Sequence, residues 1–403
     1  MKFLPFLIGA IIAGGAALAF AMIPGQPQPV RDIVGSAEGN STMPVVFENA
    51  TNLTDNEHDS VYGQVAVWDS SVYVLWQDSV SGRNYDIFIK KSDDNGTTFG
   101  APVNISNNPG FSEHPQLSVF GNNVYATWPD NTLGNREVLF SRSTDGDTTF
   151  GEAQNLSNNP SNSHNAEMAA FGNNVYVVWA DQDNEENKSI LLRASSDGGA
   201  TFGRTVNISS QANFGSFPKV GAYGNNVYVT WNVLGSEADD GLYFAKSTDG
   251  GSTFGDVIKL DSNASGESQV AVHNGTVYVI SGGLDLFEVN GLFLLKSTDG
   301  GETFADPVII DADGKFVNPT NVEVVSDSNG VAYVAGQVFA DGNEEILLMP
   351  VSENNATAVV NLSNNAKISE CPSIAMAGDD IYVVWEDLTP GNHEILYAKG
   401  SKT

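Results

Sequence analysis

The stretch Ser92-Asp93-Asp94-Asn95-Gly96-Thr97-Thr98-Phe99 decides the fold of this 403-residue chain, because four further copies of its pattern follow. The copies contain Asp145, Asp197, Asp249 and Asp299, so the pattern returns about every 51 residues. A period of that length, with one supersecondary unit in each repeat, is typical of a propeller or a solenoid. The repeat therefore predicts an array of similar units.

A tyrosine with apolar neighbours gives the number of repeats. It recurs at Tyr73, Tyr125, Tyr176, Tyr228, Tyr278, Tyr333 and Tyr382. Within one repeat, such as residues 116–157, short runs of β-branched and aromatic residues are separated by Gly, Asn, Asp or Pro, which predicts strands. Gly121-Asn122-Asn123 tolerates positive φ and predicts a tight hairpin between the first two strands. We therefore expect an all-β fold, a seven-bladed β-propeller with four antiparallel strands in each blade.

The two ends of the propeller predict how the ring closes. The last repeat stops after Ala398-Lys399-Gly400-Ser401, where its fourth strand is missing. A segment with the pattern of a fourth strand stands at residues 45–54 instead, since Asn52-Leu53-Thr54 matches Asn104-Ile105-Ser106. We predict that residues 45–54 pair with the strand near 394–400 and so join the first blade to the last.

The repeated Ser-x-Asp-x-Gly-x-Thr-Phe pattern suits the hairpin between the third and fourth strands. The Asp carboxylate accepts N–H groups of its own turn, and Gly supplies a positive φ. We expect the Thr hydroxyl to add a hydrogen bond and the Phe to fill the gap between blades. Asp147 replaces the Gly in the second copy, and residues 352–357 are a decayed sixth copy. The predicted structural residues of these Asp turns are Asp94, Asp145, Asp197, Asp249 and Asp299.

This pattern resembles the Asp-box (BNR) repeat of the sialidase-like propeller superfamily, over residues 45–403. The superfamily includes sialidases, other glycosidases, sorting-receptor ectodomains and assembly factors, so the shared fold does not transfer a function. The resemblance implies that a sialidase would need three arginines for the substrate carboxylate, a Tyr–Glu pair and an Asp. Of the six arginines, only Arg83 and Arg136 fall in loops of the predicted ligand face. The chain is therefore expected to be a non-sialidase member.

The N-terminal segment indicates where the protein acts. Lys2 precedes a nearly unbroken apolar run from Phe3 to Ile23, as in an export signal. The run is also long enough to span a bilayer. Residues 1–23 are therefore expected to be either a signal peptide or a membrane anchor, residues 24–44 a flexible tether, and residues 45–403 the propeller. Both alternatives place the propeller outside the cytoplasm, secreted or anchored to the cell surface.

The charge of the chain restricts its partners. The net charge of −31 repels nucleic acid and anionic lipid surfaces. Sialic acid is itself an anion, which also disfavours a sialidase. We expect a monomeric propeller whose partner is a cell-surface protein or a glycan, with membrane contact only through an uncleaved N-terminal segment.

The only cysteine and the glycosylation sequons have simple interpretations. Cys371 excludes an intramolecular disulfide, and we interpret it as a small buried hydrophobe. Asn-x-Ser/Thr sequons permit glycosylation of an exported chain, so a glycoprotein is expected if they are used. Several recur at one repeat position, which is also explained by the repeat consensus. The sequons begin at Asn52, Asn104, Asn155, Asn207, Asn263, Asn274 and Asn361.

Polar residues gather on one predicted face of the propeller. Strand direction places the Asp turns and the Gly-Asn-Asn turns on one face, here called the turn face, and the remaining loops on the opposite loop face. Candidate ligand residues of the loop face either end a Trp-x-Asp strand or precede a first strand: Glu57, His58, Asp78, Glu113, His114, Asp130, His164, Asp181, Glu370 and Asp387. Acidic residues also begin third strands, at Asp86, Glu137, Glu345 and Glu394.

Two interpretations of this polar ring stay open. In the first, carboxylates and imidazoles hold a cation or grip a glycan. In the second, the repeat consensus produces the ring automatically, and each acid caps a loop or pairs with the next blade. Calcium is the one cofactor that the sequence suggests, because Asp181, Asp183 and Glu185 concentrate oxygen ligands in one loop. The loop lacks the Gly of an EF-hand loop, so the sequence favours a solvated acidic loop over a calcium site. His58, His114 and His164, read as equivalent positions of adjacent blades, are a weaker metal candidate.

The sequence favours a non-catalytic binding or scaffold module at the cell surface, and no catalytic residue is assigned. The alternative is a glycoside hydrolase or lyase of the sialidase-like superfamily that uses paired carboxylates on the loop face. Ser281 and Gly336 replace the repeated Trp in two blades, so a pocket is expected first in the fifth and sixth blades.

Overall fold

The computed structural model describes residues 45–81, 84–184, 187–210, 215–233, 239–261, 268–284, 290–310, 319–327, 331–340, 342–352, 355–356 and 359–402. The predicted signal or anchor at 1–23 and the tether at 24–44 lie outside these ranges. Within them, no helix is long and apolar enough to cross a membrane.

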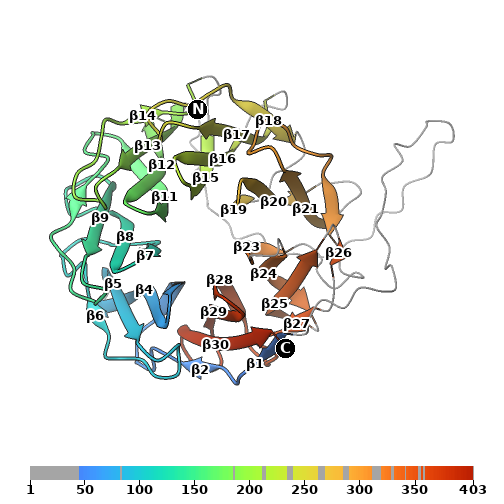
Figure 1. The fold of residues 1–403 in the computed structure, drawn as a ribbon. Coiled ribbons are helices and arrows are strands. Elements are labelled where there is room, and N and C mark those ends of the chain that lie inside the picture. Colours follow the sequence, from blue (N-terminus) through green and yellow to red (C-terminus); the bar gives the residue numbers. More distant parts are fainter. Residues whose placement is uncertain are drawn as a thin grey trace, which may run out of the picture. The chain divides into compact units, whose positions relative to one another are not determined.

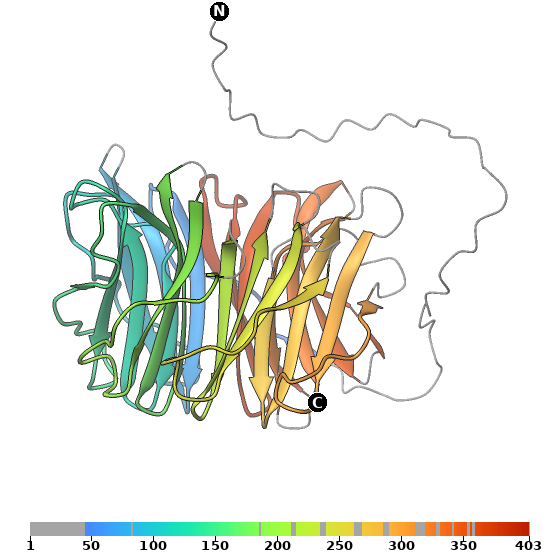
Figure 2. The same cartoon turned by 90° about the horizontal axis from the view of Figure 1, so that it is seen from above.

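Seven antiparallel sheets form a ring of blades, which confirms the predicted seven-bladed propeller (Figures 1 and 2). Blades 1 and 2 consist of β3 (Ser60–Trp68), β4 (Ser71–Ser81), β5 (Asn84–Ser92) and β6 (Val103–Asn104), then β7 (Gln116–Phe120), β8 (Asn123–Asp130), β9 (Glu137–Ser143) and β10 (Gln154–Asn155). Blades 3 and 4 consist of β11 (Asn162–Phe171), β12 (Asn174–Asn184), β13 (Asn187–Ser195) and β14 (Val206–Asn207), then β15 (Gly215–Tyr223), β16 (Asn226–Val233), β17 (Gly241–Ser247) and β18 (Ile258–Asp261).

The remaining blades complete the ring. Blade 5 consists of β19 (Ser268–His273), β20 (Thr276–Leu284), β21 (Asn290–Ser297) and β22 (Val308–Ile310). Blade 6 consists of β23 (Thr320–Ser326), β24 (Ala332–Ala340), β25 (Asn343–Ser352), β26 (Asn355–Ala356) and β27 (Val360–Asn361). Blade 7 consists of β28 (Ser369–Ala377), β29 (Asp380–Asp387) and β30 (Glu394–Lys402), completed by β1 (Val45–Phe47) and β2 (Thr51–Asn52). The first strand of each blade lies nearest the centre of the ring (Figure 1).

The second strand of each blade contains an apolar run, such as residues 72–76 in β4, because both of its faces are buried there. In β4, Trp76 belongs to an apolar cluster with Val384 and other residues of blade 7. Its neighbour Leu75 points the other way, into a cluster with Trp128 of blade 2. A strand buried on both faces reads as a continuous hydrophobic run. The core therefore consists of seven interfaces between neighbouring blades.

The N-terminal residues of the propeller close the ring as predicted. Val45 pairs with Lys402 and Phe47 with Gly400 in β1, and Thr51 pairs with Tyr397 in β2. The backbone N–H of Leu53 donates to the carbonyl of Ile395 at 2.9 Å. These strands take the place of a fourth strand in blade 7, so the sheet of the last blade contains the first residues of the propeller.

Each Asp turn is held by hydrogen bonds to its own carboxylate. Asp94 accepts from the Ser92 hydroxyl at 2.7 Å and from the Thr98 hydroxyl and N–H at 2.6 and 2.8 Å. Gly96 takes a φ of 81° and donates to Ser92. The same bonds recur at Asp197, Asp249 and Asp299.

The glycine and the phenylalanine of these turns contact the preceding blade. A Cβ on Gly199 would lie 2.6 Å from the ring of Phe140 in blade 2. The Phe202 ring packs edge-on against Phe140, with centroids 4.9 Å apart. Glycine is therefore needed both for its φ and for the close approach of two blades.

The second turn departs from this geometry because Asp147 replaces the glycine. Asp147 does not adopt a positive φ. Its N–H donates to Asp145 at 3.2 Å, and its carboxylate accepts the N–H of Thr148 at 2.8 Å. Ser143 is the hydroxyl donor to Asp145 in this turn. A single substitution thus redirects the second half of the turn.

We predict that Asp147→Gly restores the regular turn. Bonds from Thr98 and Ser92 lower the pKa of Asp94 to about 2, and the Thr253 and Ser247 bonds do the same for Asp249. The pKa of Asp145 is lowered by Ser143 and the N–H of Asp147, and it should fall further in Asp147→Gly. A carboxyl with a depressed folded-state pKa stabilises above its ordinary pKa, and this stability is lost as the pH falls through the folded-state value. The variant should therefore unfold at a lower pH.

An NMR titration of Asp145 and an acid-unfolding curve check this. Asp147→Ala is the matched control, because alanine avoids the positive φ that the regular turn requires. An equal Asp145 pKa in the two variants would contradict the explanation.

Candidate functional site

Of the Trp-x-Asp carboxylates of the loop face, Asp78, Asp130 and Asp387 are buried inside their own blades, and Asp181 is half-buried. In blade 2, Asp130 accepts from the Ser112 hydroxyl and the Asn108 amide, both at 2.7 Å, and from the Trp128 indole N–H at 3.4 Å. We call such an Asn, Ser and Asp together a staple. It ties the loop before the first strand to the end of the second strand.

The same staple occurs in four consecutive blades. In each, the Asn stands 22 residues and the Ser 18 residues before the Asp. The other members are Asn56, Ser60 and Asp78 in blade 1, Asn159, Ser163 and Asp181 in blade 3, and Asn365, Ser369 and Asp387 in blade 7. These four ligand-face candidates therefore bond within the fold.

Blade 4 has lost the staple as a unit. Val233, Gly215 and Gln211 stand at the positions of the Asp, Ser and Asn, although Trp231 is retained. Replacement of one staple residue alone would leave buried polar groups of the others unpaired. This costs more folding free energy than replacement of all three residues together. The joint replacement indicates that the three residues serve one structural purpose.

The acidic residues that begin third strands bond to the fourth strand. Asp86 accepts from the Asn104 amide at 2.7 Å and the Ser106 hydroxyl at 3.2 Å. Glu137, Glu345 and Glu394 accept in the same way from Ser157, Ser363 and Thr54.

These bonds explain why the sequons recur at one repeat position. The hydroxyl residue of Asn104-Ile105-Ser106 also accepts the N–H of Ile87 at 2.9 Å. The side-chain oxygen Oδ1 of Asn104 accepts the N–H of Asn107 at 2.9 Å. Both polar residues of the sequon therefore hold the fourth strand in place.

The three histidines do not share a repeat position. Ser60, Ser112 and Ser163 are equivalent, since each faces the Asp of its staple. His58 precedes the first by two residues, His114 follows the second by two, and His164 follows the third by one. The sequence-based alignment of the histidines was therefore wrong. Glu57 and His58 are exposed, and burial lowers the pKa of His164.

A ring of bulges on the first strands was not apparent from the sequence. One residue of each bulge adopts a left-handed backbone, which is strained for bulky side chains. These residues are Tyr62, His114, Asn165, Phe217, Asn321 and Cys371. Strained residues concentrate at functional sites, so the bulge ring is a candidate site.

The bulges of blades 7, 1 and 2 come together around a buried glutamate. The carboxylate of Glu386 accepts the N–H of Tyr62 at 2.8 Å. The Tyr62 ring lies against His114 of the next blade, with centroids 4.1 Å apart. Burial raises the pKa of Glu386, although the Tyr62 N–H and a hydrogen bond from Cys371 oppose the shift. Burial, together with Cys371 and Glu386, raises the pKa of Tyr62 to about 12.

Charged candidates surround this cluster. Glu113 forms an ion pair with Arg136 at 2.6 Å, and His393 lies 3.7 Å from Glu386. Glu370 is half-buried in the same bulge as Cys371. This cluster was not found from the sequence. The residue between Trp and Asp in the Trp-x-Asp pattern could have indicated it, because Gln77 and Glu386 each accept a bulge N–H of the next blade.

The calcium hypothesis stays a prediction. Asp181 is occupied by its staple, whereas Glu185 and the side chain of Asp183 fall outside the described residues. Within the ranges given above, no group of three or more His, Cys, Asp or Glu side chains is placed to hold a metal ion.

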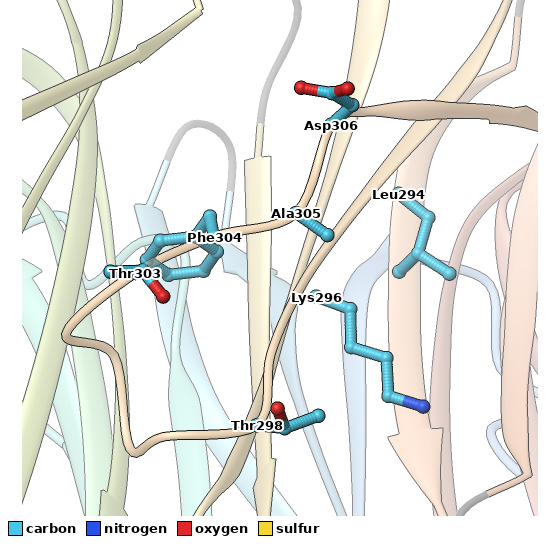
Figure 3. A pocket seen from close by; sticks show the side chains of 7 residues that line it. All are labelled: Leu294, Lys296, Thr298, Thr303, Phe304, Ala305 and Asp306. Carbon is cyan, nitrogen blue, oxygen red and sulfur yellow. The ribbon is translucent and has the colours of Figure 1, made fainter.

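A pocket of about 320 Å³ lies in blade 5, beside the last Asp turn (Figure 3). It is lined by Leu294, Lys296, Thr298, Thr303, Phe304, Ala305 and Asp306. Leu294 occupies the place that Phe244 has in blade 4, where Gly301 of the next blade's Asp turn covers the ring. The pocket is thus in one of the two blades in which it was expected, but it is not lined by Ser281 or Gly336. It lies on the side of blade 5 that corresponds to the position covered by an Asp turn in blade 4. Ser281 itself is buried.

No protein-family model matches the chain, and no curated protein matches it. Solved structures do match. A protein of unknown function from Dyadobacter fermentans DSM 18053 gives a TM-score of 0.58 at 13% identity, over 89% of this chain and 99% of that chain. Phage phi92 endosialidase gives 0.54 at 12% identity, over 88% of this chain and 69% of its own.

A mutant Trypanosoma rangeli sialidase that displays trans-sialidase activity gives a TM-score of 0.51 at 12% identity. The match covers 89% of this chain and 60% of the sialidase. At such identities a likeness establishes the fold and not the activity.

Proposed function

We propose that this chain, which has the sialidase-like propeller fold, is an exported, non-catalytic binding or scaffold module that acts at the cell surface. The observation that carries the proposal is the staple. A catalytic or metal-binding carboxylate must be accessible to its ligand, whereas Asp130 and Asp387 are buried and accept from several groups of their own blades.

The arginines support the same proposal. Arg136 is paired with Glu113. Arg142 and Arg204 donate to backbone carbonyls of neighbouring blades, and Arg193 donates to Thr205. These four arginines therefore take part in contacts of the fold, rather than forming a cluster for the carboxylate of an acidic sugar.

The alternative is a glycoside hydrolase or lyase. The specific observation in its favour is Glu386, which lies beside Tyr62 and has a raised pKa. A raised pKa favours the protonated form of a carboxyl, which is the form that a general acid requires. Glu386 is however only 4% exposed, which favours a structural role in holding the bulge of the next blade.

One experiment separates binding from turnover. The purified full-length protein is added to intact cells of the source organism from which its gene has been deleted. The amounts of bound protein and of released soluble sugar are then measured. We expect saturable association and no sugar release above background, whereas an equally acidic soluble protein should not associate. Absence of saturable association would contradict a surface-binding module.

Sugar release that is lost in Glu386→Gln would instead establish the hydrolase or lyase. Protease accessibility of the native protein on intact cells tests export. A propeller that is digested only after the cells are broken would contradict the proposed location.

A further inference from the structure

Aromatic side chains form a continuous arc at the turn face of the propeller. Trp68, Phe120, Phe171 and Tyr223 each end the first strand of their blade, immediately before the hairpin to the second strand. The ring centroids of successive members lie 4.5, 5.6 and 5.0 Å apart. The arc therefore runs across blades 1 to 4 without a break.

In blade 5 the residue at the same register position is His273, so the arc continues there with polar side chains. The Tyr223 hydroxyl donates to the Asn274 carbonyl at 2.9 Å, and the Asn274 amide lies 3.0 Å from the His273 ring. In blade 7 the position is Ala377, which ends β28 and pairs with Asp380. The aromatic run thus ends at Trp68, next to a blade that presents only a methyl group there.

The arc lies near the centre of the ring. First strands are innermost, and equivalent residues of neighbouring first strands touch one another: Lys219 pairs with Glu167 at 2.5 Å, and Gln269 donates to Glu323 at 2.7 Å (Figure 1). Trp68, Phe120 and Tyr223 stand on the same side of their strands as Gln64, Gln116 and Lys219, because strand side chains alternate. The arc is therefore a collar around the propeller axis at the turn face.

Trp68 differs from the other tryptophans of the chain in its exposure. It is 40% exposed, while Trp76, Trp128, Trp179, Trp231 and Trp385 are at most 1% exposed. Phe120, Phe171 and Tyr223 are half-buried. A row of accessible aromatic rings is unusual on a monomeric protein and marks an interaction site.

The hairpins beside the arc carry amides in blades 2 to 4, whereas the hairpin after Trp68 carries the exposed side chains of Asp69 and Ser70. Asn122, Asn173 and Asn225 are exposed at the tips of the hairpins that follow Phe120, Phe171 and Tyr223. A carboxamide both donates and accepts hydrogen bonds. Rigid aromatic contact area next to adaptable Asn and Gly is a composition that suits recognition of varied polar ligands.

Three lysines of the turn face are neutralised in ion pairs, whereas the carboxylates of its Asp turns, such as Asp94 and Asp249, are hydrogen-bonded by neutral groups and keep their negative charge. Lys91 pairs with Asp93, Lys246 with Glu302, and Lys402 with Asp327. The remaining charge of the protein is strongly negative, which disfavours an anionic ligand.

We propose that this collar binds a neutral glycan, with a sugar ring stacked on Trp68 and its hydroxyls bonded to the hairpin amides. The apolar face of a sugar ring matches an aromatic face, and its hydroxyls match groups that both donate and accept. The inference rests on the proposed function, since it names a ligand class and a surface for the binding module. A basic or proline-rich peptide is the competing occupant and is distinguished by the experiment.

The experiment titrates the full-length protein with neutral oligosaccharides built from glucose, mannose, xylose or N-acetylglucosamine, and with a basic and a proline-rich peptide. Trp68 supplies a built-in probe, because acrylamide quenches the fluorescence of an exposed tryptophan. We expect one oligosaccharide class to bind and to protect Trp68 from quenching. Trp68→Ala should weaken binding at least about tenfold, and Trp68→Tyr should retain most of it.

Phe339→Ala is the matched control, because Phe339 is 67% exposed at the end of β24 and lies outside the collar. It should leave affinity within about twofold, in keeping with the small effects of surface substitutions. Equal binding by wild type and Trp68→Ala would overturn the proposal. So would the absence of any oligosaccharide binding at about 10 mM, where even weak specific binding is measurable.

Protection of Trp68 by a peptide, and by no sugar, would overturn the ligand class. The cell-association assay separates this failure from failure of the proposed function. If Trp68→Ala associates with cells as wild type does, the collar proposal fails and the binding module stands. If wild type does not associate either, the module itself is contradicted.

Discussion

Deletion of residues 45–54 should lower the melting temperature of the propeller by about 10 °C or more. The deletion removes β1 and β2, which are the outermost strands of blade 7. It also removes two apolar side chains from the core. Leu53 packs in the interface of blades 7 and 1, and Phe47 packs against the interface of blades 6 and 7. Loss of one buried leucine side chain alone costs about 2–5 kcal/mol. For domains of 150–250 residues, each kcal/mol moves the midpoint by about 2–4 °C.

Differential scanning calorimetry of the full chain and the variant checks this. Deletion of residues 1–44 is the control and should leave the midpoint of the propeller nearly unchanged. The shortened protein should also self-associate in size-exclusion chromatography, because β30 becomes an unpaired edge strand.

A point variant tests the same contact in case the deletion variant cannot be produced. Gly400→Val should give a smaller shift in the same direction, since a Cβ at Gly400 would lie 2.8 Å from the ring of Phe47. Equal melting of the deletion variant and the full chain would show that ring closure does not depend on these strands.

Asp387→Asn should destabilise the propeller by about 2–5 kcal/mol, although the two side chains have nearly the same size. Asp387 is fully buried and accepts from Ser369 at 2.9 Å, Asn365 at 2.8 Å and Trp385 at 3.2 Å. An amide nitrogen there would face a donor and leave it unpaired. Urea unfolding measures the loss.

A double-mutant cycle in blade 2 tests the staple as a unit. Ser112→Ala and Asp130→Val should together cost less than the sum of the single variants, by about 0.5–3 kcal/mol, because each single change leaves a buried partner unpaired. Glu57→Gln, an exposed candidate of the same face, is the control and should stay within about 0.5 kcal/mol. Strict additivity, or a harmless Asp387→Asn, would mean that the buried carboxylate is retained for a ligand instead.

The staple shows where repeat reasoning succeeds and where it stops. The sequence located the Trp-x-Asp residues and offered two interpretations of them, a ligand ring or a repeat consensus. Only the hydrogen bonds of Asp130 and Asp387 distinguish the two, because a pattern gives the position of a carboxylate and not its partners. The absence of the same residues from blade 4 was visible in the sequence, yet it had no meaning until the partners were known.

Two features escaped the sequence for a geometric reason. The bulge at Tyr62 shifts the register of one strand, so Tyr62, His114 and Cys371 occupy one position although their neighbours differ in sequence. The aromatic collar joins residues about 51 positions apart that differ in type: Trp68, Phe120, Phe171 and Tyr223. Neither has a consensus that a repeat search would detect.

The sequence by itself determined the number of blades, the four-stranded plan, the Asp turns and the closing of the ring by residues 45–54. Each depends on local turn chemistry and apolar periodicity, which are properties of consecutive residues. The tertiary structure decided which carboxylates are occupied, which histidines are equivalent, and that Trp68 alone among the tryptophans is exposed. Those properties arise only when blades pack side by side, since burial and hydrogen-bond partners are set by residues of neighbouring strands and blades.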